Sequence, residues 1–273
     1  MSRPRTTLEH AATVLAALPF VVPLAWLVLA AFRPAAELFQ PRAGWLPERL
    51  TLANLTEAWS LLDFGRFMLN TALVAALTVV GTVLSSSLVG YAFATLAARG
   101  KGVLFALLLS TVMLPSAVTL LPTFVLFSRL GWVGTYLPLV VPHFFANAFY
   151  VFLFRQFFRS LPRDLFDSAE LDGCSPLAAY WHVALPLARP AVAVVAVFAA
   201  VGAYNEFLEP LVYLTRESTF TVSLGLAFFD GLYVSQPQYV IPVSLVALLP
   251  VGLAFFLAQR ALQRGIVTTG GRW

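Results

Sequence analysis

Long apolar stretches dominate the chain, and most polar residues gather in the segments between them. Six stretches reach about 20 residues or more, the length that an α-helix needs to cross about 30 Å of hydrocarbon. They cover residues 11–32, 69–98, 103–127, 133–154, 187–214 and 239–258. The pattern predicts an all-α, polytopic membrane protein with six transmembrane helices, in which residues 1–273 form a single transmembrane domain.

The first stretch follows Arg3 and Arg5, as the apolar region of a signal peptide also follows basic residues. Its length of 22 residues, 11–32, exceeds the roughly 7–15 apolar residues of a signal peptide. We therefore expect the first stretch to be a retained membrane span.

Composition supports a membrane protein, and the positions of the basic residues predict its orientation. Only 11% of the residues are charged, whereas soluble domains carry about a quarter, and the mean hydropathy is +0.84. These values exclude disorder, a coiled coil and a nucleic-acid-binding domain. If the N-terminus is cytoplasmic, eleven of the 17 Lys and Arg residues lie in inside segments and six lie outside. This bias follows the positive-inside rule and predicts that both termini are cytoplasmic.

Residues 155–189 form the one predicted cytoplasmic connection that is long enough to fold. Arg163–Leu171 is amphipathic and carries acidic residues near its start, which favours a helix. Gly173 then predicts a turn, and Ser175-Pro176 predicts the cap and first position of a second short helix that runs to Leu185-Pro186. A solvated connector needs none of these features, so the segment is interpreted as a docking surface for a cytoplasmic partner.

This connection also carries a spaced motif. Asp167-Ser168-Ala169 is followed after three residues by Gly173, and then after nine residues by Val183-x-Leu185-Pro186. The spacing resembles the EAA motif, Glu-Ala-Ala-x3-Gly-x9-Ile-x-Leu-Pro, of the membrane permease subunits of binding-protein-dependent ABC importers. Asp, Ser and Val stand here for Glu, Ala and Ile.

The resemblance extends over nearly the whole chain. Tyr204–Leu211 resembles the Trp-Asn-Asp-Phe-Leu-x-Pro-Leu stretch of the carbohydrate branch, which is related to the smaller permease subunit of the maltose transporter. Phe67–Thr71 resembles the entry to the second span of that branch, and Asn147–Phe158 resembles the end of its fourth span. Gln259–Gly271 is similar to the branch's C-terminal tail but shorter, which leaves any contact of the tail with an ATPase open.

The resemblance implies the type I permease fold of ABC importers and a division of labour among subunits. The chain would form half of a pore for a carbohydrate in the bacterial cytoplasmic (inner) membrane. Its partners would be a second permease subunit, two copies of an ABC ATPase, an extracytoplasmic solute-binding protein and membrane lipid, with no nucleic acid. The chain would be no enzyme and bind no cofactor or metal, because ATP and Mg would bind to the ATPases. In agreement, the sequence contains no G-x-x-x-x-G-K-[ST] phosphate-binding loop.

The resemblance also assigns residues to ATPase coupling. In this hypothesis the helix around Asp167 docks on the ATPase, where carboxylates meet basic side chains and Leu165, Phe166 and Ala169 fill an apolar cleft. The coupling residues are Asp167, Ser168, Ala169, Glu170, Asp172, Gly173, Leu185 and Pro186.

A second set of residues is predicted to line the solute path, because polar side chains within apolar spans are functional candidates. Hydroxyl and amide groups near aromatic faces are suited to binding sugars. Glu206 matches the acidic position of the family stretch, whereas Glu209 does not, so pore-facing and interfacial positions both remain open for Glu209. The candidates are Asn70, Tyr91, Asn147, Asn205, Glu206 and Glu209. Residues 85–87, three consecutive serines, either join this path or allow close helix packing.

The sequence leaves the solute open among carbohydrates, glycerol phosphates, polyamines and peptides. A secondary transporter is the less favoured alternative, because it usually has an internal repeat and charged residues in mid-span, and neither is visible. An intramembrane enzyme would require a catalytic motif, and no such spacing is found. His10, His143 and His182 are far apart in the sequence and do not form a metal-binding pattern.

Overall fold

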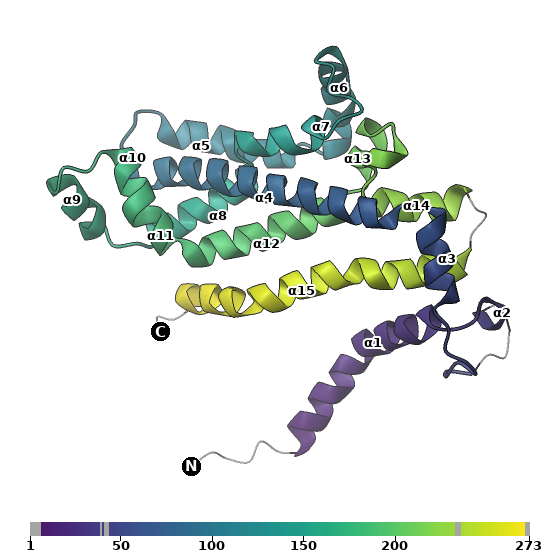
Figure 1. Cartoon of the computed structure of the whole chain (residues 1–273). Helices are drawn as coiled ribbons and strands as arrows, with labels where there is room; N and C mark the ends of the chain where they lie inside the picture. Colours follow the sequence, from purple (N-terminus) through teal and green to yellow (C-terminus); the bar gives the residue numbers. More distant parts are fainter. Residues whose placement is uncertain (1–6, 39, 41–43, 233–235, 271–273) are drawn as a thin grey trace. The chain divides into compact units, whose positions relative to one another are not determined.

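The computed structural model describes residues 7–38, 40, 44–232 and 236–270, and all regular elements in this part of the chain are helical. The α-helices are α1 Thr7–Ala31, α2 Ala35–Leu38, α3 Ala53–Leu61, α4 Phe64–Thr95, α5 Lys101–Ser110, α6 Ser116–Arg129, α7 Leu137–Val140, α8 Ala148–Arg159, α9 Asp164–Leu171, α10 Pro176–Ala179, α11 Leu185–Leu187, α12 Arg189–Asn205, α13 Leu208–Tyr213, α14 Val222–Leu232 and α15 Pro237–Gly270 (Figure 1). Shorter 3-10 or π-helical turns are η1 Thr111–Met113, η2 Val141–Phe145, η3 Tyr180–Ala184 and η4 Glu217–Thr219. The all-α prediction is confirmed.

Four helical segments are long and apolar enough to cross a membrane: Ala12–Ala31, Phe64–Thr95, Leu137–Arg159 and Pro237–Phe256. Two bent helix pairs meet the same test together, namely Lys101–Met113 with Ala117–Arg129, and Pro176–Leu187 with Arg189–Asn205. The described residues therefore contain the six predicted spans if each bent pair counts as one span.

Three of the predicted continuous spans are broken: 103–127, 187–214 and, at Ala146 between η2 and α8, 133–154. The stretch 103–127 changes direction at Pro115, which has no N–H to donate and holds Leu114 in an extended conformation. The stretch 187–214 is interrupted at Ala188, just before α12, and again after Asn205, where Glu206 is extended. The prediction of one helix over residues 187–214 was therefore wrong, because average hydrophobicity does not detect such breaks.

The chain divides into two compact units, residues 1–65 with 225–249, and residues 66–224 with 250–273, and the boundaries fall within α4, α14 and α15. In the first unit the chain after α1 is fastened by Arg33, whose guanidinium donates to the carbonyl of Trp45 at 3.1 Å and lies 3.7 Å from the carboxylate of Glu37. The side-chain amide of Asn54 donates to the carbonyl of Arg33 at 2.8 Å. These bonds fix the connection from α1 to α3.

In the second unit, α4 and α8 approach each other closely. Gly90 of α4 makes this approach possible, because a Cβ atom there would lie only 2.7 Å from Cβ of Phe154 and 3.1 Å from the carbonyl oxygen of Val151. Within this unit, α9, α10 and α11 gather at one end of α4, α8 and α12, and α7 and α13 lie toward the other end (Figure 1). The two sets of candidate residues are found mainly at these two ends.

Candidate functional site

The predicted helix, glycine turn and second helix are all present in the connection between α8 and α12. Asp164 and Asp167 occupy the first turn of α9, where carboxylates interact favourably with the helix dipole. Gly173 ends the helix with φ +82°, a value that favours glycine. The N–H of Gly173 donates to the carbonyl of Glu170 at 3.0 Å, and that of Cys174 donates to Ala169 at 2.9 Å. These two bonds form a Schellman motif, which stops α9 at a defined residue.

The second helix begins as the sequence predicts. The hydroxyl of Ser175 accepts the N–H of Ala178 at 3.2 Å, and Pro176 occupies the first turn of α10. The chain then continues through η3 and α11 to α12. A hydroxyl cap, a proline and a glycine therefore define the whole segment with local interactions.

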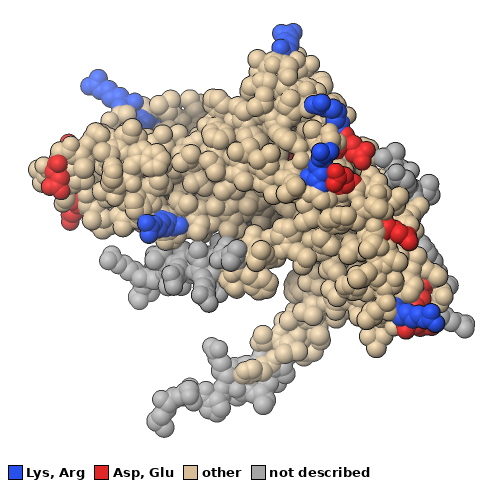
Figure 2. Space-filling model, in the orientation of Figure 1, with Lys and Arg blue, Asp and Glu red and all other residues tan. Residues whose placement is uncertain are grey.

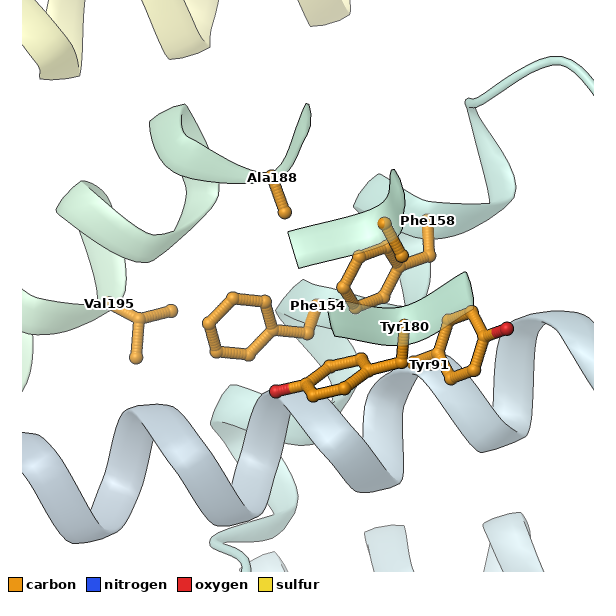
Figure 3. Close-up of a cluster of buried hydrophobic side chains, with 7 residues drawn as sticks. Tyr91, Phe154, Phe158, Tyr180, Ala188 and Val195 are labelled. Carbon is orange, nitrogen blue, oxygen red and sulfur yellow. The ribbon is translucent and has the colours of Figure 1, made fainter. Parts of the chain in front are cut away.

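A buried aromatic cluster attaches this segment to the spans (Figure 3). Tyr180 of η3 is 1% exposed, and its ring centroid lies 5.4 Å from that of Tyr91 of α4. The cluster contains Tyr91, Phe154, Phe158, Tyr180, Ala184, Ala188 and Val195. Its members come from α4, α8, η3, the α11–α12 junction and α12, so the segment shares one core with three spans.

Two hydrogen bonds fix the orientation of this attachment. The hydroxyls of Tyr180 and Ser87 are 2.8 Å apart, and the hydroxyl of Tyr91 donates to the carbonyl of Pro176 at 3.1 Å. Tyr91 was predicted to lie on the solute path, but the structure places it under α10 instead. Sequence reasoning could not detect this, because a tyrosine within a span is equally compatible with a pore and with a core.

The outward face of α9 is acidic. Figure 2 shows acidic side chains gathered at the end of the molecule that α9 forms. Asp167, Glu170 and Asp172 are exposed, as is Ser168. Leu171 is 90% exposed and presents a large apolar side chain beside these carboxylates. This face combines the charge and the apolar surface that a docking site requires.

Two of the apolar residues expected to face an ATPase point toward the protein's own interior. Ala169 is 5% exposed, and Phe166 packs against the aromatic cluster with its ring centroid 6.0 Å from that of Tyr91. The expectation that Ala169 fills a partner's cleft was therefore wrong, because its side of the helix faces the core, whereas Phe166 is half-buried against the protein's own cluster. Leu165 is exposed, Leu185 is half-buried and Pro186 is exposed.

At the other end of α12, Glu206 and Glu209 lie close together. An oxygen of the Glu206 carboxylate accepts the N–H groups of Leu208 at 3.0 Å and Glu209 at 3.2 Å, and so caps α13. Glu206, Glu209 and His143 line a cavity of about 90 Å³ with residues of α4, α7 and α12. His143 was not predicted to take part, although its position within an apolar stretch was an available signal.

The three asparagines predicted to line the solute path form bonds within the protein. The Asn70 amide donates to the carbonyls of Ser218 and Phe220 at 3.0 and 2.9 Å. The Asn147 side-chain oxygen accepts two N–H groups at the start of α8, and Asn205 donates to the carbonyl of Val201 at 3.0 Å. None of the three lines the cavity around Glu206.

Two serines of α4 accept hydrogen bonds from backbone N–H groups at a break in the facing span. Ala146, between η2 and α8, has φ +61°, which is unusual for a residue other than glycine. Its N–H donates to the hydroxyl of Ser85, and the N–H of Asn147 donates to the hydroxyl of Ser86, each at 3.2 Å. Broken helices within a membrane require such partners, because lipid offers none. Hydrogen bonding at this break therefore accounts for the serines at positions 85 and 86 at least as well as close helix packing by small residues does.

Among the residues that the structure describes, no group of three His, Cys, Asp or Glu side chains could hold a metal ion. The geometry instead combines an exposed acidic helix, a core that attaches it to three spans, and polar breaks in two of those spans.

Comparisons with known proteins agree with this geometry. The arabinooligosaccharides transport system permease protein of Halalkalibacterium halodurans is 35% identical over 260 residues, which cover 92% of this chain and 90% of the relative. The sn-glycerol-3-phosphate transport system permease protein of Pectobacterium atrosepticum is 30% identical over 269 residues, 95% of each chain. A chain in the crystal structure of a bacterial ABC transporter involved in the import of the acidic polysaccharide alginate has the same fold, with a TM-score of 0.79 at 19% identity over 96% of this chain and 100% of that one.

The family model covers the end of the second span, the third to sixth spans and the connection that holds α9. It describes a binding-protein-dependent transport system inner membrane component and matches residues 86–268. Together with the 35% identity to a transport permease over 92% of the chain, this match settles the family. The chain belongs to the family of binding-protein-dependent transport system inner membrane components.

Proposed function

We propose that this chain forms half of the translocation pore of an ATP-driven importer for a carbohydrate. A second permease subunit completes the pore, two ABC ATPase subunits bind ATP and Mg, and an extracytoplasmic binding protein delivers the solute. Both termini face the cytoplasm, and residues 1–273 act as one permease domain. The arabinooligosaccharide relative supports a carbohydrate, and the glycerol phosphate relative supports the second candidate solute.

The observation that carries this proposal is the way in which α9 is attached. Its outer face offers the carboxylates of Asp167 and Glu170 with the exposed side chain of Leu171. Its inner face joins the aromatic cluster through Phe166. A partner that binds the outer face would thus move a helix that shares a core with the pore.

The proposed mechanism is a rigid transfer of movement. ATP-driven closure of the ATPase pair displaces α9, and the Schellman turn at Gly173 passes the displacement to α10. The hydrogen bonds of Tyr180 with Ser87 and of Tyr91 with Pro176 transmit it to α4. Because α11 continues into α12 through Ala188, α12 follows. The pore would change from inward-facing to outward-facing.

The solute path is proposed to pass the cavity around Glu206. Glu206, Glu209 and His143 supply hydrogen-bonding groups there, and the break after Asn205 allows α12 and α13 to move separately. The bonds of Asn70 and Asn147 suggest that these residues shape the path and do not touch the solute.

The experiment is reconstitution of the importer with both permeases, the ATPase pair and the binding protein in liposomes. ATP hydrolysis is measured with a panel of sugars, glycerol 3-phosphate, a polyamine and a peptide. We expect a mono- or oligosaccharide to stimulate hydrolysis, and stimulation by the other solutes alone would refute the carbohydrate assignment. Robust transport by this chain without an ATPase would refute the importer and indicate a secondary transporter.

The coupling role is tested by reversing charge on α9. The double variant Asp167→Lys/Glu170→Lys should lose most of its association with the ATPase and most uptake. The matched control Glu217→Lys changes an exposed carboxylate in η4, away from the coupling segment, and should retain both. Equal ATPase association in the two variants would contradict docking through α9.

A further inference from the structure

A second cavity lies where α4 and α8 end and α5 begins. It has a volume of about 420 Å³, which is within the range of about 300–1,000 Å³ that is usual for small-molecule sites. The ends of the two spans contribute Thr95 and Arg159, and the start of α5 contributes Lys101. Arg163 lines the cavity from the residue before α9, and Asp167 lines it from the first turn of α9. The cavity therefore connects three spanning segments with the coupling helix.

The charge around this cavity favours an anion. Three cationic side chains, Lys101, Arg159 and Arg163, line it with a single carboxylate, that of Asp167. Arg159 and Arg163 are exposed, and neither forms an ion pair within the part of the chain that the structure describes. Lys101 donates to the carbonyl of Leu96 and so keeps its ammonium group at the cavity. Guanidinium groups without a partner are well suited to bind phosphate through paired hydrogen bonds.

The position of the cavity favours a lipid as the source of that phosphate. The apolar sequences of α4, α5 and α8 all end or begin at its walls, which marks the level of a membrane interface. The neighbouring surface of α5 exposes Val103, Leu104 and Leu107 at 65%, 57% and 59%, as helices in contact with acyl chains do. In the orientation of the proposed function this interface is the cytoplasmic one, where basic pockets attract anionic headgroups.

We propose that this cavity binds the phosphate headgroup of an anionic phospholipid through Arg159 and Arg163. The headgroup lies beside Phe158 and Phe166, and its acyl chains follow the exposed face of α5. Because Arg163 directly precedes α9, the bound lipid contacts the element that the proposed function assigns to ATPase coupling. The link to coupling rests on that function, whereas lipid binding itself can be measured on the chain alone.

The test is native mass spectrometry of the purified chain, titrated with phosphatidylglycerol or phosphatidylcholine. We expect clear preference for phosphatidylglycerol. Removal of one cation near an anionic surface weakens binding about fivefold, so Arg159→Ala/Arg163→Ala should weaken phosphatidylglycerol binding about 25-fold. The control Arg189→Ala changes an exposed arginine that does not line the cavity, and it should bind like the unchanged chain.

The charge-retaining variant Arg159→Lys/Arg163→Lys should keep most of the preference, which separates loss of charge from loss of folding. Equal binding of the two lipids by the unchanged chain would overturn the proposal, as would equal losses in the double alanine variant and in Arg189→Ala. Displacement of the lipid by millimolar inorganic phosphate would assign the cavity to a soluble anion and overturn the lipid assignment. No ATPase takes part in this assay, so its failure is independent of any failure of the coupling role.

Discussion

A methyl group added at Gly90 should separate α4 from α8. The new Cβ atom would lie 2.7 Å from Cβ of Phe154, and 3.1 Å from both the carbonyl oxygen of Val151 and the backbone nitrogen of Arg155. These are backbone atoms or atoms bonded directly to the backbone, so no side-chain rotation can relieve the overlap. The two helices must move apart by most of an ångström to reach ordinary contact, and Phe154 and Val151 are fully buried between them.

The magnitude follows from two opposing effects. Alanine is favoured over glycine within a helix by about 1 kcal/mol, whereas overpacking of a tight core costs about 1–3 kcal/mol. A gap of 0.5–1 Å also removes about a quarter to a half of the dispersion energy across the contact. We expect Gly90→Ala to lower the free energy of unfolding by about 1–2 kcal/mol, which corresponds to a fall in Tm of about 2–6 °C.

Two other glycines in helices provide matched controls. A Cβ atom at Gly202 of α12 meets nothing within 4 Å, so Gly202→Ala should keep the gain in helix propensity. At Gly81 the obstacle is the ring of Phe144, at 2.6 Å, and this ring is 44% exposed and free to rotate outward. Thermal unfolding in detergent, followed by tryptophan fluorescence, should therefore rank Tm as Gly202→Ala above Gly81→Ala above Gly90→Ala. If Gly90→Ala is as stable as Gly202→Ala, the rigid contact between α4 and α8 is refuted.

Four further outcomes are expected. Ala146→Gly should raise Tm by about 2 °C, because glycine removes about 1–2 kcal/mol of strain at φ +61° and loses part of that gain to entropy; an unchanged or lower Tm would argue against strain. Ser86→Ala should lower the free energy of unfolding by about 1 kcal/mol through loss of the bond to the N–H at the span break, as measured by denaturation, and an unchanged value would show that water replaces the hydroxyl. At Gly173, with φ +82°, Asn is tolerated better than Val, so Gly173→Val should reduce uptake per ATP hydrolysed more than Gly173→Asn, and equal values would contradict a role of this turn in coupling. Leu171→Ser should leave Tm within about 1 °C because the side chain is exposed, yet weaken co-purification with the ATPase, and full recovery would remove Leu171 from the docking face.

The connection between α8 and α12 was predictable because its signals are local. An acidic first turn, Gly173 and the pair Ser175-Pro176 act within a few residues of the chain, and the structure contains the cap and the turn that they predict. The all-α class was equally accessible, since a length of about 20 apolar residues is a property of the sequence alone.

The errors concern contacts between distant segments. Phe166 faces the core because Tyr91, 75 positions earlier, packs against it. Asn70 looks like a donor to a solute, but its partners lie near residue 219, at carbonyls that no local pattern indicates. Breaks within spans were missed for the same reason, because the hydroxyls that stabilise the break after Ala146 come from α4.

The attachment of α10 and η3 has a consequence for protein engineering. The loop would look transplantable, since its turn and caps lie within residues 163–187. However, its register depends on two hydroxyls of α4, that of Ser87, which bonds Tyr180, and that of Tyr91, which bonds the carbonyl of Pro176. A chimaera that receives the loop alone would leave the hydroxyl of Tyr180, which is buried, without its partner. A functional graft would have to carry the matching face of α4 as well, so the smallest exchangeable module is discontinuous in the gene.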